Sequence, residues 1–161
     1  MPNSALAWMA IARSLLGVRE VPGPGNSTVI AGWLSGLKAW WAEDATPWCG
    51  VFVAHVMHEA GQPIAKQWYR AKSWLKWGVG CPPAYGAVCV LGRQGGGHVF
   101  FVTKVSKSFV WGIGGNQGDA VSEARFARAR VLGFRWPKAL PLPLPLQIVA
   151  DGGGEISRNE Q

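Results

Sequence analysis

The sequence predicts an α+β protein in which N-terminal helices pack on a C-terminal antiparallel β-sheet. Three observations support this prediction. Apolar residues recur at helical spacing over residues 1–77, the spacing changes to that of strands from about residue 85, and short turn sequences separate the strands. Helices followed by an antiparallel meander are typical of the α+β class.

Four helical segments are expected in the first half. The first lies within Met1–Gly17, with Asn3 or Ser4 as its cap, Gly17 as its stop and an apolar face of Leu6, Trp8, Met9, Ile11, Leu15 and Leu16. A rigid turn at 21–25 precedes a short helix that Ser27 caps and that ends near residue 37. A third helix is predicted over 46–60, and one or two further turns over 71–77.

Four strands are expected in the second half. Glycines 95–97 make the first connection and residues 106–108 the second. The strands predicted from their apolar, β-branched and aromatic residues are 86–91, 98–105, 109–113 and 131–136.

The chain of 161 residues is long enough for one hydrophobic core, and its 48% hydrophobic content is that of a globular protein. Residues 1–137 are interpreted as a single domain. Residues 138–161 form a Pro-Leu-rich and Gly-rich C-terminal tail, extended over 141–146 and frayed from 151 onward. Two alternatives stay open for the Pro-Leu arm: a loose tail, or docking on its own domain or a neighbour.

The net charge of +7 favours anionic polymers as partners. Charge alone does not select among such polymers, and the alternative is that it serves only solubility. The sequence lacks a run of about 20 uncharged apolar residues that would span a membrane. Its N-terminus lacks the basic region of a signal peptide, and Arg13 interrupts the apolar stretch. We therefore expect synthesis in the cytoplasm without a signal peptide.

Three cysteines are present, Cys49, Cys81 and Cys89, and an odd number argues against a disulfide framework. Cys89 lies in an apolar strand and is interpreted as an inert core residue. Cys81 precedes two prolines in a loop, where a bridge to Cys89 stays open.

Cys49 is the candidate nucleophile. Thr46 is a good helix N-cap and Pro47 suits the first helical position, which puts Cys49 in the first turn. Free backbone N–H groups and the helix dipole there favour the thiolate, lowering a thiol pKa of about 8.5 toward roughly 3.5 to 7.5. The same N–H groups could hold the oxyanion of a tetrahedral intermediate. The alternative is a small buried hydrophobic residue.

A nucleophilic cysteine needs a base, and the sequence offers three histidines. His55 and His58 share the predicted helix of Cys49. They lie about 9 and 13 Å along its axis and point roughly 240° and 180° away, so neither reaches the sulfur. His98 follows three glycines and opens an apolar strand, which makes it the candidate general base. The alternative is a histidine that only ends a turn.

The base needs an orienting partner, and the next strand is followed by residues 114–119, Gly-Gly-Asn-Gln-Gly-Asp. An amide oxygen that accepts from an imidazole N–H would fix the ring and its tautomer. Asn116 is the candidate, with Gln117 and Asp119 as alternatives. Turn formation alone would also explain these residues.

The sequence contains three motifs in this order: Asp44-x-x-Pro47-Trp48-Cys49, Gly97-His98-Val99 and Gly114-Gly115-Asn116-Gln117. Together they resemble the CHAP and NlpC-type peptidoglycan hydrolases of the papain-like superfamily. The Pro-Trp-Cys and Gly-Gly-Asn-Gln motifs resemble, more narrowly, a set of small phage and bacterial proteins that share them. The resemblance covers most of the chain, from about Trp8 to Pro137. It implies a papain-like fold with Cys49 as nucleophile, His98 as base and Asn116 as third residue.

Two positions depart from the family pattern. A glycine usually follows shortly after the His-Val pair, whereas Phe100 stands here, so the floor of the cleft is expected to differ. Some CHAP members place an acidic residue two positions before the asparagine, and Gly114 replaces it.

The resemblance implies a cysteine peptidase or amidase, an endolysin or a secreted lytic effector with bacteriolytic and antimicrobial action. It would cleave a peptide bond or the N-acetylmuramoyl-L-alanine amide in peptidoglycan through an acyl-enzyme. The expected partners are stem peptides and anionic cell-envelope polymers, without cofactor, metal or specific nucleic acid. The protein would act in the periplasm or cell wall after release or secretion.

Further residues are candidates for oxyanion stabilisation and for the wall of a substrate groove. Asp44 or Gln117 could supply a second oxyanion donor or shape the helix entrance. The indole rings of Trp48, Trp111 and Trp74 could form a groove wall that stacks on sugar, with core packing as the alternative for each.

Three other functions are considered. A papain-like deamidase or transglutaminase-type toxin would keep the triad and act on proteins. A non-catalytic, basic, Trp-rich module would bind the cell wall or nucleic acid. A zinc site from His55, His58 and a cysteine has poor spacing, and the CxxC and HExxH patterns are absent from the sequence.

Overall fold

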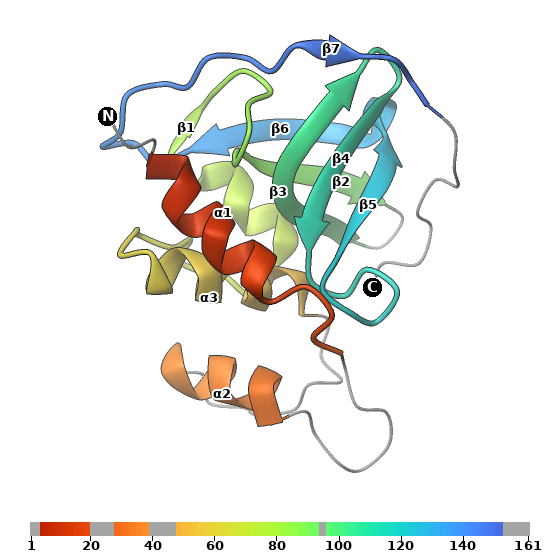
Figure 1. The fold of residues 1–161 in the computed structure, drawn as a ribbon. Helices are drawn as coiled ribbons and strands as arrows, with labels where there is room; N and C mark the ends of the chain where they lie inside the picture. Colours follow the sequence, from red (N-terminus) through yellow and green to blue (C-terminus); the bar gives the residue numbers. More distant parts are fainter. Residues whose placement is uncertain (1–3, 20–27, 39–47, 94–95, 153–161) are drawn as a thin grey trace.

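A computed structural model describes residues 4–19, 28–38, 48–93 and 96–152 (Figure 1). Its first half contains the helices α1 (Ser4–Ser14), α2 (Thr28–Gly36) and α3 (Cys49–Glu59) and the 3₁₀ helix η1 (Ala71–Lys76). In Figure 1, α1 and α3 lie against the sheet, and α2 lies on the side of α3 that faces away from it. The α+β prediction, helices followed by an antiparallel sheet, is confirmed.

The sheet has seven strands in the order β1-β6-β2-β3-β4-β5, and β7 pairs with β3 off this path. All pairings are antiparallel except the parallel pairing of β7 with β3. The strands are β1 (Val79–Gly80), β2 (Val88–Arg93), β3 (Gly96–Ser106), β4 (Phe109–Gly114), β5 (Ser122–Ala127), β6 (Val131–Trp136) and β7 (Ile148–Val149), with a short 3₁₀ turn η2 (Arg128–Arg130) before β6.

The four predicted strands are confirmed as β2, β3, β4 and β6. The bounds of β6 are those predicted, and the other three strands have shifted ends. The predicted glycine connection is wrong for two of its three members, because Gly96 and Gly97 belong to β3 and pair with Arg93 and Gly92 of β2. The third glycine lies outside the described residues. Strand β5 was not predicted, because its Ser-Glu-Ala-Arg-Phe-Ala sequence has no run of apolar or β-branched residues.

The first helix is shorter than predicted. It ends at Ser14, and the chain turns so that the Gly17 N–H donates to the Val121 carbonyl at 2.9 Å. This turn carries Leu16 to the surface, where it is 42% exposed, so the prediction that Leu16 belongs to the buried face is wrong. Trp8 and Met9 are buried as predicted, whereas the side chain of Leu6 and the predicted turn 21–25 lie outside the described residues.

The hydrophobic core lies between the helices and the sheet. Phe52 of α3 packs edge-on against Phe101 of β3, with ring centroids 6.0 Å apart. Trp33 of α2 packs against Phe52 at 5.9 Å and stacks on His55 at 4.9 Å, which fastens α2 to α3. Burial of these aromatic side chains supplies much of the apolar surface removed from water.

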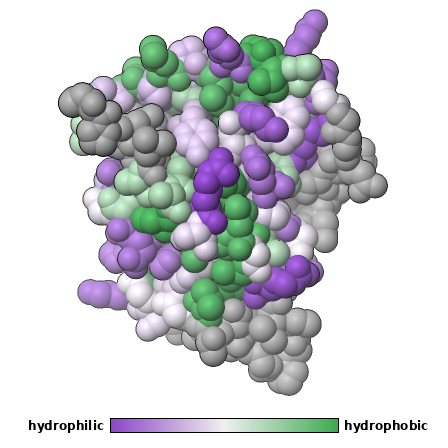
Figure 2. Space-filling view, viewed as in Figure 1, coloured by the Kyte–Doolittle hydropathy of each residue, from purple (hydrophilic) through white to green (hydrophobic). Residues whose placement is uncertain are grey.

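The Pro-Leu arm docks on its own domain, one of the two alternatives left open by the sequence. The Leu146 N–H donates to the Pro83 carbonyl at 2.8 Å, and β7 pairs with the end of β3. Asp151, expected to be frayed, accepts from the Ser108 N–H at 3.2 Å. Figure 2 shows hydrophobic side chains on the surface at the edge where β7 lies in Figure 1, in line with the 57% exposure of Ile148.

Within the described parts of the chain, every helix is too short or too polar to cross a bilayer.

The approach of β3 to β4 depends on the missing side chain of Gly112. A Cβ atom there would lie 2.0 Å from the Phe100 ring and 2.5 Å from the Phe101 carbonyl oxygen. We expect Gly112→Ala to lower the free energy of unfolding by about 1–3 kcal/mol, because the strand pair must move apart. Urea unfolding followed by tryptophan fluorescence measures this change.

The matched control is Gly92→Ala on β2, where a Cβ would meet only the Leu132 side chain, at 3.5 Å. This variant should stay within about 0.5 kcal/mol of the wild type. Equal stability of the two variants would contradict the packing described for Gly112.

Candidate active site

Cys49 is the first residue of α3, with Trp48 as the N-cap. The helix was predicted to start at Thr46. Thr46 and Pro47 lie outside the described residues, as does Asp44, and Trp48 makes no side-chain cap hydrogen bond. Because Cys49 opens the helix, the N–H groups of the first turn have no acceptor within the helix. Cys49 therefore lies at a helix N-terminus as predicted. It is the first helical residue, whereas a cap at Thr46 would make it the third.

The Cys49 thiol is surrounded by backbone donors and is buried. N–H groups of Val99, Gly50 and Cys49 itself lie within hydrogen-bonding range of the sulfur, and each lowers the thiol pKa. Burial has the larger effect and raises the pKa of Cys49 above its ordinary value, while the positive charge of Arg93 lowers it. The helix N-terminus, which the sequence indicates, favours the thiolate, whereas desolvation in the folded protein opposes it.

The contact between Val99 and the thiol brings β3 to the start of α3. His98 directly precedes Val99 and is fully buried on β3, paired with Leu91 of β2. Its ring lies 5.8 Å from the Phe100 ring and 5.4 Å from the Phe126 ring, which restrict its orientation. The structure thus brings together the two elements that carry the predicted nucleophile and base.

The His98 ring is held from one side by an amide. Its Nε2 lies 2.8 Å from Oε1 of Gln117. The Gln117 Nε2 donates to the Ser122 carbonyl at 2.7 Å and to the Gly112 carbonyl at 3.4 Å, so the amide NH₂ faces acceptors and the amide oxygen faces the histidine. An amide oxygen can only accept, and His98 therefore carries a proton on Nε2. In neutral His98 this leaves Nδ1 as the basic nitrogen.

A buried glutamine next to Asn116 contacts His98, and the assignment of Asn116 as the third residue stays a prediction. Asn116 was the candidate and Gln117 the alternative, and in the structure the Gln117 side chain makes the hydrogen bond to His98. Asn116 is buried with a φ of 61°, and Gly118 and Asp119 also have positive φ values of 68° and 59°. This left-handed turn directs the chain so that the residue after Asn116 faces β3.

Two glycines make room for this arrangement. A Cβ at Gly114 would lie 2.3 Å from Oε1 of Gln117, and a Cβ at Gly115 would lie 2.7 Å from the side chains of Phe52 and Trp48. The acidic residue that some CHAP members have at position 114 is therefore incompatible with the position of Gln117.

The departure at Phe100 has a similar explanation. Its ring stacks on Phe126 with centroids 4.8 Å apart and occupies the space over Gly112, which has no Cβ. The floor beside His98 is thus built from two aromatic rings, where the family pattern has a glycine.

Two of the three tryptophans predicted to line a groove are core residues. Trp48 is 1% exposed and Trp74 is 0% exposed, so neither presents an indole face to a ligand, and the packing alternative describes them better. Trp111 is half-buried on β4, where Lys104 lies over its ring at 5.0 Å and Phe109 packs against it at 6.2 Å. These neighbours of Trp111 belong to the sheet and not to α3.

The other titratable candidates lie apart from this site. Cys81 and Cys89 are free thiols, without the bridge that the sequence left open. Burial raises the pKa of Cys81 to about 11 and raises that of Cys89 further. His55 is engaged in the stack with Trp33, and burial lowers its pKa. The described residues contain no group of three His, Cys, Asp or Glu side chains that could hold a metal ion.

The family comparison agrees with this geometry. Residues 41–116, slightly less than half of the chain, match the CHAP domain model, which confirms the predicted resemblance to CHAP domains over that stretch. The match contains Cys49 and His98 and ends at Asn116, one residue before Gln117. CHAP domains are generally amidases or peptidases associated with peptidoglycan. Searches among curated proteins and among solved structures gave no match.

The hydrogen bond from His98 to Gln117 predicts one tautomer. Long-range ¹⁵N–¹H correlation spectra at a pH where the ring is neutral should show a protonated Nε2 and an unprotonated Nδ1 for His98. In Gln117→Ala the acceptor is gone, and we expect the His98 signals to shift toward a mixture of tautomers. The exposed His58 is the internal control and should not change. A protonated Nδ1 in the wild type would contradict the assigned amide orientation.

Proposed function

We propose that the protein is a cysteine peptidase or amidase that cleaves an amide bond of peptidoglycan, either within the stem peptide or at N-acetylmuramoyl-L-alanine. The observation that carries the proposal is the contact between the start of α3 and the start of β3. The Cys49 thiol lies against the Val99 N–H there, and the neighbouring His98 is oriented by Gln117. The CHAP match supports the substrate class.

In the first half of the reaction, Cys49 sulfur attacks the carbonyl carbon and its proton passes to Nδ1 of His98. The tetrahedral oxyanion is stabilised by N–H groups at the start of α3, with that of Cys49 as the first donor. Expulsion of the amine breaks the C–N bond, and the His98 proton goes to the leaving nitrogen. The product at this stage is a thioester on Cys49.

In the second half, His98 takes a proton from water as the water attacks the thioester carbonyl. The C–S bond breaks, the sulfur recovers the proton, and the new carboxylic acid leaves. The high pKa that burial gives Cys49 makes a neutral thiol the resting form, so proton transfer to His98 accompanies the attack.

Gln117 acts in this scheme through His98. Its amide NH₂ donates to the carbonyls of Ser122 and Gly112, so it is unsuited to a second role as oxyanion donor. Asp44, the other residue suggested for that role, lies outside the described residues. We propose Gly50, whose N–H is also close to the sulfur, as the second donor.

The test is digestion of purified sacculi. We expect Cys49→Ser to reduce the rate of clearing by at least about 1000-fold, because the hydroxyl is a far weaker nucleophile than the thiol. The masses of the released fragments identify the bond, since an amidase separates glycan from peptide and an endopeptidase leaves a new peptide terminus.

Cys89→Ser is the matched control, because Cys89 lies in the core away from α3, and its refolded variant should keep most of the activity. Clearing by Cys49→Ser at the wild-type rate would refute the catalytic proposal and favour a binding module. Inactivity of the wild type on sacculi would refute the peptidoglycan assignment.

A further inference from the structure

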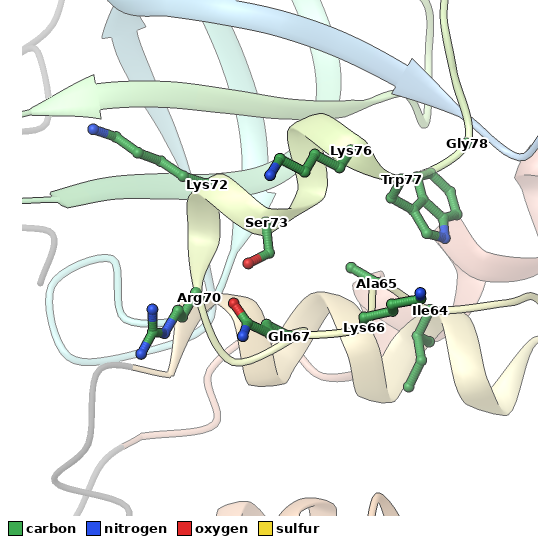
Figure 3. Close-up of a pocket in the computed structure, with 10 residues that line it drawn as sticks. All are labelled: Ile64, Ala65, Lys66, Gln67, Arg70, Lys72, Ser73, Lys76, Trp77 and Gly78. Carbon is green, nitrogen blue, oxygen red and sulfur yellow. The ribbon is translucent and has the colours of Figure 1, made fainter.

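A basic pocket lies between η1 and the preceding loop (Figure 3). Its volume is about 770 Å³. Among the ten described residues that line it, four carry a positive charge and none carries a negative one. The four are Lys66, Arg70, Lys72 and Lys76.

The pocket adjoins both elements of the proposed site. The loop carbonyl of Trp68 approaches the first turn of α3 so closely that a Cβ at Gly50 would lie 2.3 Å from its oxygen. On the other side, the stem of Lys72 lies against the start of β3, where a Cβ at Gly97 would be 3.0 Å from its Cγ. Gly50 follows Cys49 and Gly97 precedes His98, so the loop and η1 contact the two elements that carry the proposed nucleophile and base.

Indole hydrogen bonds hold the walls of the pocket in place. Trp74 of η1 donates from Nε1 to the Trp68 carbonyl at 3.1 Å, and Trp77 donates to the Pro63 carbonyl at 3.0 Å. The Trp77 carbonyl in turn accepts from Nε of Arg135 at 2.8 Å. These bonds link the loop, η1 and the sheet, so the pocket is formed before a ligand arrives.

Figure 3 shows Ser73 pointing from η1 toward Gln67 of the opposite loop, while the Lys76 side chain runs alongside η1. The hydroxyl and the amide add neutral hydrogen-bonding groups to the cationic rim. Trp77 lies at one end and adds an apolar surface. A short peptide with small side chains and free carboxylates matches this mixture, because ammonium groups bind carboxylates by charge-assisted hydrogen bonds. A long phosphate polymer would need a continuous basic stripe along the surface. In Figure 3 the charged ends of Lys72, Arg70 and Lys66 point in different directions around the pocket, so they form separate cationic points at its rim.

We propose that this pocket binds the free carboxylates of the stem peptide and thereby positions the scissile amide at Cys49. The inference rests on the proposed function for the identity of the peptide. Removal of the carboxylate charges on the ligand, or of the lysine charges in the pocket, should weaken binding. Removal of both should weaken binding no further than removal of the carboxylate charges alone.

The experiment uses two synthetic stem peptides of the same sequence, one with all its carboxylates free and one with every carboxylate converted to a carboxamide. The pocket variant is Lys66→Gln/Lys76→Gln in the full chain, and the charge-matched control is Lys107→Gln/Lys138→Gln, at two exposed lysines outside the pocket. Hydrolysis kinetics are measured for the wild type and both variants at low salt, where the interaction is least screened.

For the free acid, we expect the pocket variant to raise KM on the order of tenfold with kcat nearly unchanged, and the control variant to leave both unchanged. For the amidated peptide, wild type and pocket variant should have the same high KM. Equal KM values for the two peptides in the wild type would overturn the proposal. Equal losses in the pocket and control variants would also overturn it, because they would reflect net charge alone.

Calorimetric titration of the Cys49→Ala variant with the same peptides separates this inference from the proposed function. Tighter binding of the free acid than of the carboxamide supports carboxylate binding in the pocket. This holds even if the wild type hydrolyses neither peptide, because the absence of hydrolysis would refute only the proposed function. Equal affinity for the free acid and the carboxamide would refute carboxylate binding in the pocket, whether or not either peptide is hydrolysed. Tighter binding of inorganic polyphosphate than of the free acid, lost in the pocket variant, would refute the carboxylate assignment.

Discussion

The hydrogen bond between Nε2 of His98 and Oε1 of Gln117 is the interaction on which the rest of the site depends. Both side chains are buried, so the bond forms without competition from water and leaving either partner unsatisfied would be costly. The two acceptors on the Gln117 NH₂ fix the direction of the amide, and the amide fixes the tautomer of the imidazole. A neutral amide in this position orients His98 without adding a negative charge beside it.

This hydrogen bond in turn requires the close packing of β3, β4 and the turn after β4. Gly112 accommodates the Phe100 ring, Gly114 accommodates the Gln117 oxygen, and Gly115 allows the turn to contact α3. The glycines thus have a steric role that is specific to Phe100 and Gln117. Phe100 and the missing carboxylate at position 114 depart from the family pattern in the sequence, and in the structure they belong to one packing solution around His98.

Several features followed from the sequence because local chemistry determines them. The end of the third helix near Ala60, the apolar strands and the exclusion of His55 by helical geometry are of this kind. Other features depended on tertiary contacts. Asn116 and Gln117 offer the same amide group, and only the left-handed backbone of Asn116 decides which of them faces His98. Desolvation of Cys49 by the assembled core is likewise invisible in the sequence, and it reverses the direction of the pKa shift expected from the helix terminus.

In the proposed mechanism Cys49 acts as a pair with His98, whereas the other thiols do not. Alkylation by iodoacetamide at pH 7, resolved by peptide mass spectrometry, tests it most directly. Cys81, half-buried with a pKa of about 11, is the internal reference. Burial raises the pKa of both thiols, but in the proposed pair His98 takes the Cys49 proton, so Cys49 should react faster than Cys81 in the wild type. His98→Ala should slow Cys49 at least tenfold without affecting Cys81. A Cys49 rate that does not change in His98→Ala would contradict the pairing.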